Sequence, residues 1–345
     1  MKINSKKHLL ENLFLVFAVA LLTFSCSRAT NENLSSWTEN APAKKALVEY
    51  VESVTKKDSA DFIPLENRIA VFDLDGTLIL ETDPTYFDWA LFEHRVLDDP
   101  RYNASEEERE IARNSREKGI MPNLSSKRES MVSKVYTGLS LKEFEEFITD
   151  FMEQDQPGFI GMKRGESFYK PMVEVVNYLS ENGFTVYICS GTDRLTVRPL
   201  VAKNLPVLRP YQVIGSDSTI ISSNQGEIDG LSYTFTKGDE LILGGKNLVK
   251  NLQMNKVAVI AQEVGVQPVL AFGNAMSDAS MVNYTINNNP YKALGFMLCC
   301  DDTEREYGNP KKAAQMKSDC EKFGWIPISM KDDWKTIYGE GVKRR

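Results

Sequence analysis

Histidine is almost absent from this chain of 345 residues, which contains only His8 and His94. Zinc chemistry that relies on a cluster of histidines is therefore excluded. A Ser-His-Asp triad needs only one histidine, but no G-x-S-x-G stretch accompanies it. His94 lies in an amphipathic stretch with Trp89, Phe92 and Val96, so we interpret it as a packing or surface residue.

Cysteine is also scarce, with five residues in the whole chain: Cys26, Cys189, Cys299, Cys300 and Cys320. No C-x-x-C pair occurs among them, and this argues against a structural zinc site. Two interpretations of the last four stay open. Cys320 pairs with Cys299 or Cys300 in an oxidising compartment, or all four are small buried apolar side chains.

Long apolar runs are missing too, because the longest, Leu13 to Phe24, is too short to span a bilayer. Lysines precede this run, a pattern that predicts a signal peptide over residues 1–25. Ser25-Cys26 resembles the end of a bacterial lipoprotein signal, although Thr23 stands where leucine is usual. The resemblance implies a protein of the periplasm or cell envelope that is anchored to the membrane by lipid on Cys26. Plain secretion and an N-terminal anchor are the alternatives.

Excess positive charge is absent, since the formal net charge is −7. Such a chain is not suited to coat nucleic acid, and we expect no nucleic-acid partner. An anionic substrate must therefore be held by local cations in the site. The length allows one large domain or two modest ones, and 42% hydrophobic residues suffice for a packed core.

The patterns along the chain predict an α/β fold with a Rossmann-like parallel sheet and an inserted α-helical cap. Residues 26–40 are polar and aperiodic, as in a tether, and residues 41–84 form the first part of the core. Charged helical segments fill residues 85–168, and Ser140 with Glu143 makes a capping-box pattern there. Strand and helix then alternate over residues 169–345, with hairpin signals between 211 and 245.

The most informative stretch is the apolar run that begins at Ile69 and ends in Asp73-Leu-Asp75-Gly-Thr77. Alternation along a strand places Asp73 and Asp75 on one side of the chain. Open α/β sheets hold their ligands at the carboxyl ends of their strands. The pattern therefore predicts a carboxylate nucleophile and a second carboxylic acid beside one substrate.

Three further patches follow in order along the chain. Ser190-Gly191 ends a predicted strand, where a hydroxyl and an amide can bind phosphate oxygens. Lys256 lies at the start of a helix, and Lys246 in Gly244-Gly-Lys246 competes with it, although the spacing does not match a P-loop. Gly273-Asn274 and Asp278 then follow a second buried strand. We favour Lys256 as the cation.

These four patches resemble, in type and order, the motifs of the haloacid dehalogenase superfamily of aspartate-nucleophile phosphatases, and within it an uncharacterised bacterial group of the phosphoserine-phosphatase-like branch. The resemblance implies Mg²⁺ as cofactor, held by Asp73, Asp75, Asn274 and Asp278. Asp73 is then the nucleophile and Asp75 the acid-base residue. The same resemblance implies that Thr77, Ser190, Gly191 and Lys256 bind substrate phosphate. Asn274 departs from the superfamily, which more often has aspartate there.

The sequence thus predicts a lipid-anchored, Mg²⁺-dependent phosphomonoesterase that acts on a small phosphate ester. The cap is expected to close over the pocket and to select the leaving group. A phosphotransferase of the same superfamily and a binding lipoprotein without activity are the alternatives. The sequence does not identify the ester.

Overall fold

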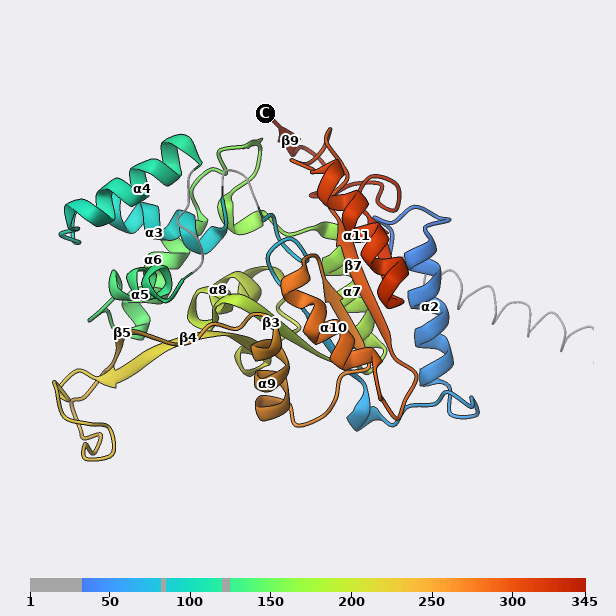
Figure 1. The fold of residues 1–345 in the computed structure, drawn as a ribbon, viewed down its shortest axis with the longest axis horizontal. Coiled ribbons are helices and arrows are strands. Elements are labelled where there is room, and N and C mark those ends of the chain that lie inside the picture. Colours follow the sequence, from blue (N-terminus) through green and yellow to red (C-terminus); the bar gives the residue numbers. More distant parts are fainter. Residues whose placement is uncertain (1–32, 82–84, 120–124) are drawn as a thin grey trace, which may run out of the picture.

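A mostly parallel seven-stranded sheet forms the centre of the molecule (Figure 1). The computed structural model describes residues 33–81, 85–119 and 125–345. The strand order is β5-β4-β3-β1-β6-β7-β8, in which β4 and β5 are antiparallel and the other neighbours are parallel. The bounds are β1 Ile69–Phe72, β3 Thr185–Asp193, β4 Val213–Ser222, β5 Leu241–Val249, β6 Leu270–Gly273, β7 Leu294–Cys299 and β8 Ile326–Ser329. The predicted α/β fold is confirmed.

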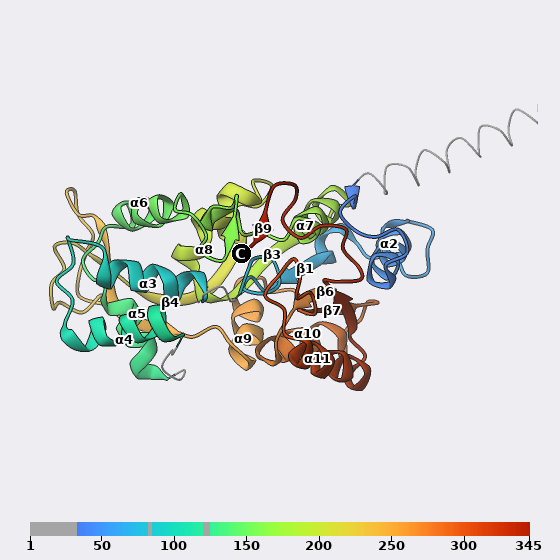
Figure 2. The ribbon, with the colours of Figure 1, turned by 90° about the horizontal axis from the view of Figure 1, so that it is seen from above.

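Helices cover both faces of the sheet, because alternate side chains of each inner strand are buried on opposite sides. In β1, Ala70 and Phe72 join the apolar cluster under α2, α7 and α8, whereas Ile69 and Val71 join the cluster under α9, α10 and α11. Figure 2 shows α7 on one side and α9, α10 and α11 on the other. The bounds are α2 Pro42–Thr55, α7 Lys170–Glu181, α8 Arg194–Asn204, α9 Met254–Glu263, α10 Ala279–Ile286 and α11 Pro310–Phe323.

Between β1 and α7, the described residues contain four α-helices that form the cap, which lies to one side of the sheet in Figure 1. They are α3 Phe87–Leu97, α4 Glu106–Lys118, α5 Ser126–Lys134 and α6 Leu141–Met152. The capping box predicted at the start of α6 is confirmed: Ser140 Oγ accepts from Glu143 N at 3.1 Å and the carboxylate accepts from Ser140 N at 2.8 Å. His94 stacks on Phe147 and Phe151, as expected of a packing residue.

The cap leaves and rejoins the core at one point, because Leu80 N donates to Ser167 O (2.9 Å) and Tyr169 N donates to Leu78 O (2.8 Å). It also contacts a long arm made of the antiparallel strands β4 and β5, which form one long hairpin where hairpins were expected between 211 and 245. Gly138 N donates to Leu243 O in β5, and Leu243 N donates to Leu139 O. Cap and sheet are therefore connected on two sides. A short antiparallel pair, β2 Phe159–Ile160 with β9 Lys343–Arg344, completes the fold.

The N-terminal tether was predicted to reach residue 40, and this is wrong for residues 33–40. Leu34 and Trp37 are fully buried, and the Trp37 indole N–H donates to Pro171 O at 3.0 Å. Trp37 also packs edge-on against Trp334, with ring centroids 5.9 Å apart. Burial of these two apolar side chains, together with hydrogen bonds such as Thr38 N to Asp333 O (2.8 Å), fixes the stretch to the core. The predicted signal peptide and Cys26 lie outside the described residues.

The structure bears on the pairing of the cysteines and on membrane-spanning helices. Cys189, Cys299, Cys300 and Cys320 are all free thiols, and the second interpretation holds for the three that are buried, while Cys300 is only partly buried. The helices within the described ranges include none whose length and apolar character would suffice to cross a membrane.

Candidate active site

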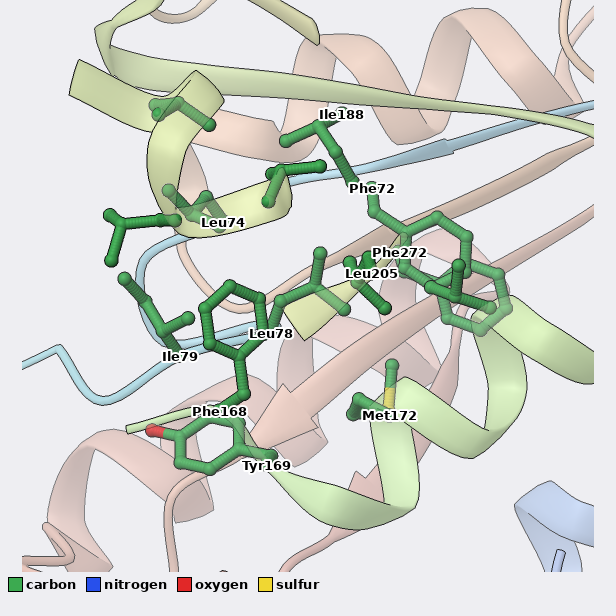
Figure 3. Close-up of a cluster of buried hydrophobic side chains, with 14 of the residues drawn as sticks. Phe72, Leu74, Leu78, Ile79, Phe168, Tyr169, Met172, Ile188, Leu205 and Phe272 are labelled. Atoms are coloured by element: carbon green, nitrogen blue, oxygen red, sulfur yellow. The ribbon is translucent and has the colours of Figure 1, made fainter. Parts of the chain in front are cut away.

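The chain turns sharply where β1 ends, and this turn carries the first two acidic side chains. Asp73 N donates to the Phe272 carbonyl in β6 (2.9 Å), and the Leu74 carbonyl accepts from the N–H groups of residues 77–79. Leu74 and Leu78 are fully buried in the core shown in Figure 3. Gly76 has a φ of 78°, and a Cβ there would lie 1.9 Å from Asn274 Nδ2. The turn is thus fixed by backbone bonds and packing, and it needs glycine at residue 76.

Lys256 of α9 joins three elements at the carboxyl edge of the sheet. Its Nζ lies 2.5 Å from Asp73 Oδ1, 2.8 Å from Asp278 Oδ1 and 2.7 Å from the Cys189 carbonyl of β3. The lysine is fully buried, and Asp73 and Asp278 are nearly so. The structure therefore brings together side chains 73 and 278, which are far apart in sequence, and it makes Lys256 rather than Lys246 the lysine that contacts Asp73.

Burial and charge act in opposite directions on these groups. Burial alone would lower the pKa of Lys256, but the carboxylates of Asp278 and Asp73 raise it above its ordinary value, so the ammonium stays charged. Burial and the charge of Asp278 raise the pKa of Asp73 to about 7, against the opposing effect of Lys256. The nucleophile candidate therefore depends on positive charge nearby to stay ionised.

Asp75 occupies a different environment from Asp73. Burial raises its pKa well above the ordinary value, and the charges of Asp88 and Asp73 add to the rise. Thr192 Oγ1 donates to Asp75 Oδ2 at 2.8 Å, whereas Asp75 Oδ1 is buried with no hydrogen-bond partner among the described residues. A carboxyl group with a raised pKa and one free oxygen is suited to carry a proton.

Thr77 and Asn274 lie near Asp73 Oδ2, the oxygen that does not contact Lys256. Thr77 Oγ1 is 3.3 Å from Asp73 Oδ2 and 3.5 Å from Asn274 Oδ1. The Asn274 amide group donates to Glu81 Oε2 at 3.2 Å, and Lys312 of α11 pairs with the same carboxylate at 3.0 Å. The amide of Asn274 is thereby oriented with its nitrogen toward Glu81 and its oxygen toward the Thr77 hydroxyl.

Asp278 holds the loop that follows β6. Its Oδ2 accepts from the backbone N–H groups of Asn274 and Ala275, both at 3.1 Å, while its Oδ1 faces Lys256. A Cβ on Gly273 would lie 2.7 Å from Asp278 Cβ, so the close approach depends on glycine. Both oxygens of Asp278 are thus engaged within the protein, and the residue fixes the position of Asn274.

Ser190 and Gly191 lie at the end of β3, as predicted. Ser190 is fully buried and its Oγ accepts from Thr192 N at 3.0 Å. Asn251 Nδ2 donates to Ser190 O at 3.0 Å, and Ser216 Oγ donates to Gly191 O at 2.6 Å. Gly191 itself lines the cavity described next. The position of Ser190 and Gly191 is therefore fixed by hydrogen bonds from β4 and from the residue pair that follows β5, as well as by β3 itself.

A cavity of about 250 Å³ opens between this edge of the sheet and the cap. From the core it is lined by Asp73, Asp75, Gly191, Thr192 and Asn274, and from the cap side by Tyr86, Asp88 and Arg128. Thr77, Ser190, Lys256 and Asp278 lie directly behind the lining. Both acidic side chains of the first motif thus face the same space.

The donor atoms in this cavity fit a hard cation such as Mg²⁺, which prefers oxygen. Asp73 Oδ2 and Asn274 Oδ1 lie 3.3 and 3.5 Å from the same hydroxyl, Thr77 Oγ1, and Lys256 contacts the other Asp73 oxygen. Over the described ranges, no three His, Cys, Asp or Glu side chains group as a metal site. Asp73, Asp75 and Asn274 line the cavity and are the residues that could hold such a cation.

Three residues of the site were missed by the sequence prediction. Thr192 follows Ser190-Gly191 directly, and its hydroxyl was the only visible signal for a contact to Asp75. Glu81 lies just beyond the first motif, and Lys312 comes from the distant helix α11. No sequence pattern connects these two, since they meet only in the folded chain.

Fold and site together define an α/β enzyme whose carboxylate pair, buried lysine and second acidic loop meet at the carboxyl ends of parallel strands. Residues 70–283, more than half of the chain, match the family model for haloacid dehalogenase-like hydrolases. The chain belongs to this family, and the prediction of an enzyme of this superfamily is confirmed. No curated protein matches the sequence.

Solved structures with a similar fold have low sequence identity. A conserved protein of unknown function from Anaerococcus prevotii is 14% identical, with a TM-score of 0.51 over 83% of this chain and 91% of that one. Cytosolic 5′-nucleotidase IIIB bound to cytidine is 14% identical, with a TM-score of 0.48 over 85% and 87%. A phosphoserine phosphohydrolase-like protein from Francisella tularensis is 15% identical, with a TM-score of 0.40 over 72% and 92%. At this identity the likeness is one of fold alone.

Proposed function

We propose that the protein is a Mg²⁺-dependent phosphomonoesterase that hydrolyses a small phosphate ester through an aspartyl-phosphate on Asp73. The observation that carries the proposal is the buried Lys256 ammonium between Asp73 Oδ1 and Asp278 Oδ1, at 2.5 and 2.8 Å. Attack of a carboxylate on a phosphate brings two anions together. A fixed cation beside the nucleophile compensates for their repulsion without reorganising.

In the first step an Asp73 oxygen bonds to phosphorus while the bond from phosphorus to the leaving oxygen breaks. Asp75 gives its proton to that oxygen, a role supported by its raised pKa and its position in the same cavity. In the second step water attacks phosphorus, Asp75 takes a proton from this water, and phosphate leaves Asp73. Each proton transfer contributes about 10²- to 10⁴-fold to the rate.

Asp73, Asn274 and the Asp75 carbonyl are the groups that would hold Mg²⁺, with Asp278 fixing Asn274 from behind. When bound, the ion supplies positive charge to the phosphate oxygens and to the nucleophile. Thr77 orients Asp73 Oδ2, and Gly191 lines the cavity, where its amide would bind a phosphate oxygen. We assign Ser190 to the support of that loop and to phosphate binding.

We place the enzyme in the cell envelope, held by lipid on Cys26. The support for this location is the leader of residues 1–25 together with Ser25-Cys26. Metabolic labelling of the expressed protein with a fatty acid, compared with Cys26→Ser, tests the anchor directly. Label that is equal in both proteins would refute it.

Hydrolysis of p-nitrophenyl phosphate by the purified protein, with Mg²⁺ and with chelator, tests the activity. We expect Mg²⁺-dependent turnover that falls at least about a thousandfold in Asp73→Asn, because the nucleophile is lost. Trapping of ³²P on wild type but not on Asp73→Asn would report the covalent intermediate. Equal activity in both proteins, independent of metal, would overturn the proposal. Transfer of phosphate to added alcohols in place of water would favour the phosphotransferase alternative.

A further inference from the structure

The side chain of Asn274 has two different ends, and only one of them can bind a cation such as Mg²⁺. Its amide oxygen is a ligand that hard cations accept, whereas its NH₂ group only donates hydrogen bonds. A half-turn about the last side-chain bond exchanges the two ends. The Thr77 hydroxyl, 3.5 Å from Asn274 Oδ1, can either donate or accept, so it does not select between them. The orientation of the amide therefore depends on another neighbour.

Glu81 makes this selection. An ionised carboxylate only accepts hydrogen bonds, so Glu81 Oε2 can pair with the Asn274 NH₂ group, at 3.2 Å, but not with the amide oxygen. Both residues line the catalytic cavity. Gly76 leaves room for their contact, because a Cβ there would overlap the Asn274 amide and lie 3.0 Å from Glu81 Oε2. The pair is therefore built into the same turn that carries Asp73 and Asp75.

Glu81 is itself held by two further elements. Lys312, in the first turn of α11, lies 3.3 Å from Glu81 Oε1 and 3.0 Å from Oε2. The Tyr86 hydroxyl, directly before α3 of the cap, donates to Glu81 Oε1 at 3.1 Å. Among the described residues, Lys312 pairs with Glu81 and with none of the candidate ligands of the cation. Any effect of this lysine on Asn274 thus passes through Glu81.

The inference that follows rests on the proposed Mg²⁺-dependent function. We propose that Glu81 is a positioning residue: held by Lys312, it pairs with the NH₂ group of Asn274 and so keeps the amide oxygen available to the cation. A partner that fixes a metal ligand from behind contributes about ten- to a hundredfold to metal affinity.

Plain attraction between the Glu81 carboxylate and the cation is the competing explanation, and Lys312 separates the two. By attraction alone, loss of this lysine would tighten Mg²⁺ binding, because a positive charge near the site is removed. If Glu81 needs the lysine to stay in place, the same change loosens Mg²⁺ binding. The two explanations therefore predict opposite signs for one variant.

Calorimetric titration of the metal-free full chain with Mg²⁺ tests the proposal. We expect Kd to rise about tenfold in Glu81→Gln, because a glutamine amide can pair with either end of Asn274. In Lys312→Met, Kd should rise about three- to tenfold, and in Lys312→Arg, which keeps an ion pair, it should stay within about twofold of wild type. Lys311→Met is the matched control, since it removes the same charge from the adjacent exposed residue of α11.

A double variant checks that Lys312 acts through Glu81. In the Glu81→Gln background, Lys312→Met should change Kd no more than Lys311→Met does in wild type. Denaturant unfolding in chelator reports whether each variant is folded. The Mg²⁺ concentration that gives half-maximal hydrolysis of p-nitrophenyl phosphate should follow the same order as Kd.

The outcomes separate this inference from the proposed function. Unchanged Kd in Glu81→Gln, tighter binding in Lys312→Met, or a loss that Lys311→Met reproduces would overturn the inference. With Mg²⁺-dependent hydrolysis by wild type intact, each of these results leaves the phosphatase proposal standing. Mg²⁺ binding without hydrolysis of any ester would remove the phosphatase proposal, while the order of the Kd values would still decide the inference. A wild-type protein that neither binds Mg²⁺ nor hydrolyses an ester would overturn both.

Discussion

The side-chain amide of Asn274 donates to Glu81 over 3.2 Å, and its oxygen lies 3.5 Å from the Thr77 hydroxyl, which also contacts Asp73. Lys312 and the Tyr86 hydroxyl hold Glu81 in place at 3.0 and 3.1 Å. An aspartate at residue 274, as is common in the superfamily, would set two carboxylates against each other here. The asparagine and Glu81 therefore belong together as one unit of the site.

The first prediction follows from this pair. Asn274→Asp should lower the free energy of unfolding of the metal-free protein by about 1 to 2 kcal/mol, since a hydrogen bond becomes a repulsion. Adding Glu81→Gln should restore most of this loss, because a glutamine amide can donate to the new carboxylate. Denaturant unfolding in chelator measures the cycle. Additive effects of the two changes would show that the residues are not coupled.

The second prediction concerns Lys256. Lys256→Met should destabilise the protein by about 3 to 5 kcal/mol near neutral pH, because Asp73 and Asp278 stay buried without their cation. Acid should shrink the deficit, since the pKa of Asp73 is raised to about 7 and its protonation removes part of the uncompensated charge. In wild type the raised pKa of Lys256 means that its stabilisation is present below its ordinary pKa and is lost only as pH rises through the higher folded value.

Unfolding in chelator at several pH values between about 5 and 8 checks this prediction. Lys335→Met is a suitable control, because that lysine is exposed and its Nζ donates only to the Ser35 carbonyl among the described residues. A deficit in Lys256→Met that is the same at every pH would indicate lost packing alone.

The catalytic core could be predicted because its signals are local. Asp73 and Asp75 end a run of buried strand residues, and Ser140 and Glu143 form a cap within one helical turn. Periodicity and short spacing carry such information within a single element. The same logic located Lys256 at the start of a helix, where the structure has it.

The remaining contacts could not be predicted because tertiary packing creates them. Glu81 and Lys312 are 231 positions apart, and each alone reads as a surface charge. Trp37 lies in a polar stretch, and only its contact with Trp334 shows that it belongs to the core. The sequence predicted hairpins between 211 and 245, but nothing in it indicates that Leu243 pairs with Leu139 of the cap.

The third prediction tests the proton carried by Asp75. In wild type the hydrogen bond from Thr192 to Asp75 Oδ2 lowers the pKa of Asp75. Thr192→Val removes this bond, so the pKa of Asp75 should rise further. Since the first step needs protonated Asp75, the alkaline limb of kcat/KM should move to higher pH. Thr192→Ser keeps a hydroxyl and should behave like wild type. Alkyl phosphates are the suitable substrates because their leaving groups need the proton. An unmoved limb would assign the acid to another group.

The fourth prediction concerns Asp193, whose pKa burial raises to about 6, against hydrogen bonds from Leu195 N and Ser218 Oγ. The folded state then holds a proton that the unfolded state has released between about pH 4 and pH 6, so this residue destabilises the protein as pH rises through that range. Asp193→Asn should be more stable than wild type by about 2 kcal/mol near pH 7.5 and nearly equal near pH 4. Asparagine keeps an acceptor for Leu195 N, so the start of α8 stays capped.

Urea unfolding of Asp193→Asn and wild type at both pH values tests this prediction. A variant less stable than wild type near pH 7.5 would mean that the ionised carboxylate stabilises the fold despite its burial.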